Sequence, residues 1–126
     1  MITQKENLIV DKTINYSLEM IRYYEVLNQE KKYIIANQLL RSSTTIGANV
    51  IEAQNGESRS DFLHKIKLAA KEAYETLYWL KLCEKGEGFK FESKYQTDLE
   101  EIVRILSKII ITSKNSLPKK NKLLNS

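Results

Sequence analysis

Four stretches of the chain place apolar or small residues alternately three and four positions apart, which is the spacing of one face of an α-helix. In the most distinctive stretch, residues 38–53, the repeating face consists of Leu39, Ser43, Ile46, Val50 and Ala53. Ser42, Gly47 and Ala48 add little bulk there, so a neighbouring backbone can approach closely. We expect the rest of the chain to be organised around this helix.

The same spacing predicts one helix before this stretch and two after it. The first covers about residues 6–28, and its predicted inner face is Val10, Ile14, Ser17, Ile21 and Tyr24, flanked by Leu18 and Leu27. The third has an inner face of Phe62, Ile66, Ala69, Ala73, Thr76, Leu80 and Cys83. The fourth has an inner face of Tyr95, Leu99, Ile102, Leu106 and Ile109.

Capping residues predict where these helices begin and end. Ser58, or alternatively Ser60, caps the third helix, and a Ser93–Gln96 pair caps the fourth. The second helix, which begins near residue 32, is expected to close at 55–56 through a left-handed Asn-Gly conformation. Short connections between helices of about 35 to 40 Å make neighbours antiparallel. The predicted fold is all-α: an antiparallel up-down-up-down four-helix bundle over residues 1–114, with a basic flexible tail at 115–126.

Composition agrees with long helices and one modest core. The chain has 126 residues, of which 42% are hydrophobic, with one Pro and four Gly. Its single cysteine, Cys83, excludes an internal disulfide and suits a reducing compartment. No apolar run reaches the roughly 20 residues that a membrane helix needs, and the start has no signal-peptide pattern. We therefore expect a cytoplasmic protein that does not bind membranes.

The net charge of +4 is concentrated at the carboxyl end. The last segment carries Lys114, Lys119, Lys120 and Lys122 and no acidic residue, and the remainder is formally neutral. Such a basic segment favours weak attraction to polyanions.

The sequence provides little for catalysis. It contains no Glu-x-x-His motif for a di-iron centre and no glycine-rich phosphate loop. His64 has no evident Ser or Cys partner, and Cys83 falls on a predicted core face. We predict a protein that is not an enzyme and uses no cofactor or metal.

A polar stripe follows the second helix, through Gln38, Arg41, Thr45, Asn49 and Glu52. Arg41 is placed to pair with Glu72 or Glu75 of the third helix, which share a flank with Leu68 and Trp79. The pairing either locks the monomer or forms part of a subunit contact, where Trp and Arg are enriched. The alternative is a ligand site that uses Arg41, Asn49 and Glu52.

A second stripe runs along the third helix, opposite its apolar face. It consists of His64, Lys67, Lys71, Tyr74, Tyr78, Lys81 and Lys85. Lysines at this spacing could neutralise phosphates, and tyrosines could stack on unpaired bases. Together with Lys119 and Lys120 of the tail, the stripe is our candidate nucleic-acid surface. The alternative is an ordinary solvated helix face.

The small and polar residues in these helical patterns resemble one bacterial family. The first matching segment is QLLRSS at 38–43, followed by Ile46, Asn49 and Glu52-Ala53; the second includes Ser60-Asp61-Phe62, Lys71-Glu72-Ala73 and Tyr78-Trp79-Leu80. Over about residues 8–113 the chain is similar to the 23S rRNA intervening-sequence protein family. It departs from the pattern at Ala53, where many relatives have Gly.

The resemblance implies a four-helix bundle with no established enzymatic activity. The accessory protein of diversity-generating retroelements is similar in fold, forms a homopentamer and binds nucleic acid. By this analogy we expect a homo-oligomer, a pentamer, that binds structured RNA or DNA weakly, with Arg41, Asn49, Glu52 and Glu75 as organising residues. The alternative is a protein-interaction scaffold that binds no nucleic acid.

Overall fold

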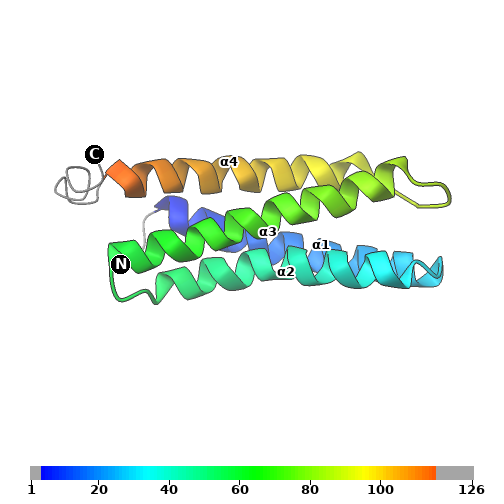
Figure 1. Cartoon of the computed structure of the whole chain (residues 1–126), viewed down its shortest axis with the longest axis horizontal. Helices are drawn as coiled ribbons and strands as arrows, with labels where there is room; N and C mark the ends of the chain where they lie inside the picture. Colours follow the sequence, from blue (N-terminus) through cyan, green and yellow to red (C-terminus); the bar gives the residue numbers. More distant parts are fainter. Residues whose placement is uncertain (1–3, 116–126) are drawn as a thin grey trace, which may run out of the picture.

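The computed structural model describes the backbone of residues 4–115 and the side chains of residues 7–115. It contains four helices: α1 (Gln4–Gln29), α2 (Tyr33–Gln54), α3 (Arg59–Lys85) and α4 (Ser93–Asn115). Successive helices run in opposite directions along one long axis (Figure 1). The predicted all-α, antiparallel four-helix bundle is therefore confirmed, and the predicted tail lies outside the described residues beyond Asn115.

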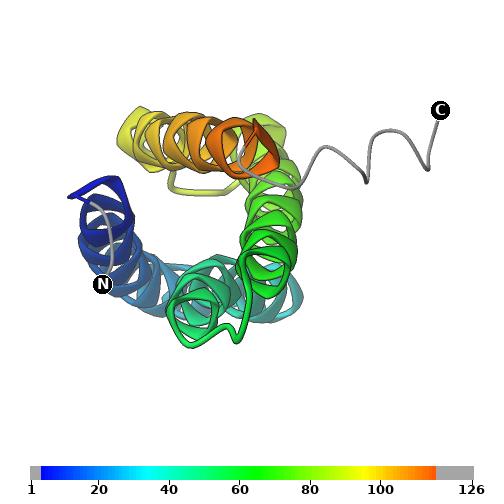
Figure 2. The ribbon, with the colours of Figure 1, turned by 90° about the vertical axis from the view of Figure 1, so that its left-hand side faces the viewer.

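Each helix packs against the next one along the chain, and α1 meets α4 to close the bundle. Viewed from the end, α2 lies opposite α4, and the approach of α1 to α4 is the widest of the four (Figure 2). One continuous cluster of buried side chains from all four helices fills the centre. The bundle is therefore a single core with one looser seam.

The predicted inner faces of α2 and α3 are confirmed residue by residue, because every member of both is buried. On α4, Leu99, Ile102, Leu106 and Ile109 are buried, whereas Tyr95 is half-buried. Cys83 is buried and forms no disulfide, as its position on the inner face of α3 predicts.

The predicted inner face of α1 is wrong by about one residue. The buried face is instead formed by Ile9, Thr13, Tyr16, Met20, Tyr23 and Leu27. Both sets have helical spacing, but Tyr16 and Tyr23 bring more area into the core. Their hydroxyl groups donate to the carbonyl oxygens of Tyr95 (3.0 Å) and Lys90 (2.7 Å). As a result Ile14, Leu18 and Ile21 lie on the outside of the bundle.

Helix ends agree with the predictions at one site and differ at another. Ser58 caps α3 by accepting a hydrogen bond from the Asp61 backbone N–H at 3.0 Å. The expected left-handed closure of α2 is wrong, because Asn55 has φ −102°. The left-handed residue is Lys31 after α1, with φ 62°. There the N–H of Lys32 reaches the carbonyl of Leu27, which is the hydrogen bond of a Schellman helix end.

Candidate functional site

The predicted basic and aromatic stripe is a continuous exposed surface on α3. All seven residues are exposed: His64, Lys67, Lys71, Tyr74, Tyr78, Lys81 and Lys85. Tyr74 and Tyr78 expose 59% and 58% of their surface. From Lys67 to Lys81 the stripe extends about 21 Å at 1.5 Å per residue. This length accommodates several phosphate groups of a nucleic-acid strand.

The lysines of the stripe differ in their partners. Lys81 forms an ion pair with Glu84 at 2.9 Å on the same helix. Among the described residues, Lys67 and Lys71 form no ion pair with an acidic side chain. Their charge is therefore available to an external anion, whereas that of Lys81 is partly neutralised.

An ion-pair network joins α2 to α3 beside this stripe. Arg41 binds both carboxylates that its spacing indicated, Glu72 at 3.3 Å and Glu75 more closely. The indole N–H of Trp79 also donates to Glu75, at 3.0 Å. Because 49% of the Arg41 side chain is exposed, the network is at the surface and not in a dry core. Its contacts lie within one chain, and its functional role stays a prediction.

This network connects to the stripe through neighbouring aromatic rings. The ring of Tyr78 packs edge-on against that of Trp79, with centroids 5.2 Å apart. Trp79 is in turn fixed by Glu75, which Arg41 holds. Arg41 therefore supports, through two intermediates, the orientation of one exposed tyrosine.

Two further residues of the α2 stripe differ in their surroundings. Glu52 binds Lys65 of α3 at 2.9 Å. Asn49 is buried, with 8% of its surface exposed. Arg41 and Glu52 thus each form a bond between the two helices, and the two cavities that Glu52 lines include neither Arg41 nor Asn49.

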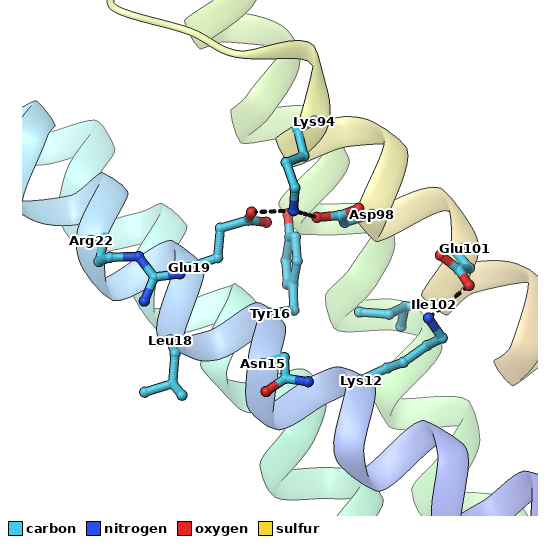
Figure 3. A pocket seen from close by; sticks show the side chains of 10 residues that line it. All are labelled: Lys12, Asn15, Tyr16, Leu18, Glu19, Arg22, Lys94, Asp98, Glu101 and Ile102. Atoms are coloured by element: carbon cyan, nitrogen blue, oxygen red, sulfur yellow. Dashed lines mark hydrogen bonds and ion pairs between the residues drawn. The ribbon is translucent and has the colours of Figure 1, made fainter.

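A charged cleft between α1 and α4 was not predicted. It has a volume of about 390 Å³, and charged residues of both helices line it (Figure 3). Lys94 of α4 bridges Glu19 of α1, at 2.8 Å, and Asp98 of its own helix. Lys12 reaches across to Glu101 at 2.7 Å. These residues are up to 89 positions apart, as for Lys12 and Glu101, so local spacing gave no signal for the cleft.

Burial controls the protonation of several groups around this cleft. It raises the pKa of Glu19, against the opposing effect of Lys94, and the Oε1 atom of Glu19 is buried with no hydrogen-bond partner among the described residues. Hydrogen bonds to Asp98 and Glu19 raise the pKa of Lys94. Burial, followed by a hydrogen bond to Glu92, raises the pKa of Tyr95 to about 12. The cleft is a set of mutually paired charges that holds α1 to α4.

The described residues contain no arrangement typical of a reaction centre. Burial raises the pKa of the Cys83 thiol, so it stays protonated near neutral pH and is a poor nucleophile. Within residues 4–115, no group of three or more His, Cys, Asp or Glu side chains is placed to hold a metal ion. None of the helices in this part of the chain has an apolar stretch long enough to cross a membrane. Lys119 and Lys120, the predicted tail contacts, lie outside the described residues.

Comparison with known proteins identifies a family and solved structures of similar fold. The model of the family described as 23S rRNA-intervening sequence protein matches residues 5–111. A solved structure from Bacteroides thetaiotaomicron VPI-5482 is 38% identical, with a TM-score of 0.78, and covers 85% of this chain and 98% of its own. That protein is described as having unknown function and belonging to the S23 ribosomal protein family. No curated protein matches.

Proposed function

Because this chain belongs to the 23S rRNA-intervening sequence protein family, we propose that it is a non-catalytic nucleic-acid-binding bundle that uses the outer face of α3. The observation that carries this proposal is the exposed stripe of Lys67, Lys71, Tyr74 and Tyr78 on one side of α3. Ammonium groups bind phosphates without sequence preference, and exposed tyrosine rings stack on accessible bases.

The electrostatics favour α3 over the α1–α4 cleft. The cleft is lined by three cations, Lys12, Arg22 and Lys94, and by three carboxylates, so it offers no net positive charge. Lys67 and Lys71 of α3, by contrast, form no ion pair with a described residue. With about two to four contacts between lysines and phosphates, we expect weak binding of structured RNA or DNA through charge and shape. The basic residues Lys119 and Lys120 of the tail would add to the same attraction.

We expect the protein to act as a homo-oligomer, with a pentamer as the form that the family analogy favours. A small bundle that exposes large apolar side chains on α1 gains stability when a second copy covers them. The competing function is a scaffold that binds a protein partner and no nucleic acid.

A salt titration tests the nucleic-acid proposal. Binding of fluorescently labelled RNA hairpins and DNA duplexes would be followed by anisotropy in wild type and in Lys67→Ala/Lys71→Ala. Each lost phosphate contact lowers the slope of log K against log salt by about 0.9, so the double variant should lower it by about 2. Removing residues 116–126 should lower it further.

The matched control is Lys31→Ala/Lys90→Ala, which removes the same charge away from the stripe. Its affinity should be slightly lower than that of wild type at every salt concentration, with little change in the slope of log K against log salt. If wild type binds no RNA or DNA at about 50 mM salt, where such contacts are strongest, the nucleic-acid proposal is wrong and the scaffold remains. Equal slopes for the α3 variant and its control would show that the nucleic-acid site is not on α3.

A further inference from the structure

An apolar groove lies on the outer surface between α1 and α2. It has a volume of about 490 Å³, and its lining residues are Thr13, Ile14, Ser17, Leu18, Thr44, Gly47, Ala48, Ile51 and Glu52. The rims are formed by Ile14, Leu18 and Ile51, which are each between 43% and 48% exposed. Ile14 and Leu18 are among the apolar residues that the packing of α1 leaves outside the core, and Ile51 belongs to α2.

The groove is shallow between its rims because the contact between α1 and α2 is built from small residues. A Cβ atom added to Gly47 would lie 3.3 Å from Cβ of Thr13, which is tighter than an ordinary contact. Ser17 and Ala48 add only small side chains beside this point. A concave apolar surface with a small-residue floor fits the ridge of a packed helix.

Acidic side chains border this groove. Glu52 lines it directly, and its carboxylate is also paired with Lys65 of α3 at 2.9 Å. Asp11 and Glu25 are exposed on α1, seven residues before and after Leu18, and therefore share its outward side. Among the described residues, Arg22 is the one cation on this side of α1, four residues after Leu18, and both residues also line the α1–α4 cleft. An acidic border disfavours phosphate backbones and anionic lipid surfaces, and it favours a ridge that carries both apolar and cationic side chains.

The chain itself provides such a ridge on α4. Ile111 is 60% exposed, and Arg104 and Lys108, seven and three residues before it, are exposed on the same side. Neither cation forms an ion pair with a described residue. The end view places α4 across the bundle from α2, which forms one wall of the groove (Figure 2).

We propose that the α1–α2 groove receives the Arg104–Lys108–Ile111 ridge of a second copy of this chain. The apolar side chain of Ile111 packs between Ile14, Leu18 and Ile51, and the cations of the ridge approach the acidic border. Each copy then offers a groove to one neighbour and a ridge to another. Such a head-to-tail contact extends from copy to copy and closes into a ring when the rotation allows. The proposal rests on the self-association proposed above and assigns surfaces to it, and neither surface includes a residue of α3.

Complementation between two variants tests this pairing. Ile14→Glu/Leu18→Glu disables the groove, and Ile111→Glu disables the ridge. All three side chains are exposed, so helicity and melting temperature should match wild type. Sedimentation velocity should show assembled wild type and each variant as a single chain. An equimolar mixture should give a two-chain species, because one intact groove meets one intact ridge.

Ile34→Glu is the control for Ile111→Glu, since it adds the same single charge at an exposed apolar side chain on neither surface. It should assemble like wild type. Three results would overturn the proposal: wild type is monomeric, a groove or ridge variant still assembles, or the mixture stays monomeric. Because Lys67→Ala/Lys71→Ala leaves both surfaces intact, unchanged nucleic-acid binding by this variant together with normal assembly would refute the α3 site alone.

Discussion

The two seams of the bundle are held together by different means. At the α2–α3 seam small buried residues bring the helices close, and the Thr76 hydroxyl lies 2.8 Å from that of Ser42 in the interior. At the α1–α4 seam the contact is wider, and half-exposed ion pairs such as Lys12 to Glu101 cross it. Close packing fixes a geometry tightly, whereas exposed ion pairs contribute little stability and tolerate change.

The largest expected effect comes from adding volume to the close seam. Ala73→Leu inserts three carbon atoms where Ala73 is fully buried, and overpacking should lower the free energy of unfolding by about 2 kcal/mol. Urea denaturation measures this. The counterpart is Asn15→Leu in the α1–α4 cleft, which should change stability by less than about 0.5 kcal/mol. Equal losses for both variants would show that the two seams are packed alike.

Removing the charge that links α2 to α3 should have a smaller effect. Arg41→Ala separates Glu72 and Glu75 from their shared cation, and because the network is half-exposed the loss should be about 1 kcal/mol. Lys12→Ala, which removes one exposed pair at the other seam, should cost about 0.5 kcal/mol or less. Fluorescence of Trp79, the single tryptophan, reports the first change directly. An Arg41→Ala variant with unchanged stability and emission would remove any organising role for Arg41.

The smallest effect is a pH dependence at the α1–α4 seam. Burial raises the pKa of Glu19 above its ordinary value of 4.5, so the folded chain holds this proton at pH values where the unfolded chain has released it. The contribution of Glu19 to stability is therefore greatest below that value and is lost as pH rises through the raised pKa. Glu19→Gln should flatten this decline. Denaturation midpoints between mildly acidic and neutral pH measure it, and parallel profiles for both proteins would contradict the assignment.

Much of the architecture was accessible from spacing alone. The inner faces of α2 and α3 were predicted completely, because each helix carries one dominant stripe of small or apolar residues. The pairing of Arg41 with Glu72 and Glu75 was also accessible. Once the inner faces of α2 and α3 are known, the residues that flank the contact between them are known too. The exposed Lys67–Lys71 stripe follows from the same reasoning.

Helix α1 shows where spacing fails. It carries two apolar stripes about one residue apart, and a helical period cannot rank them. The choice depends on whether the hydroxyls of Tyr16 and Tyr23 find carbonyl partners near the start of α4, about 70 to 80 residues away, as they do at Tyr95 and Lys90. The sequence by itself determined the number, direction and most inner faces of the helices, because these depend on local period and short connections. Only the tertiary structure decided which side of α1 is outside, and hence the groove and the charged cleft, because both are made by side chains that meet across the bundle.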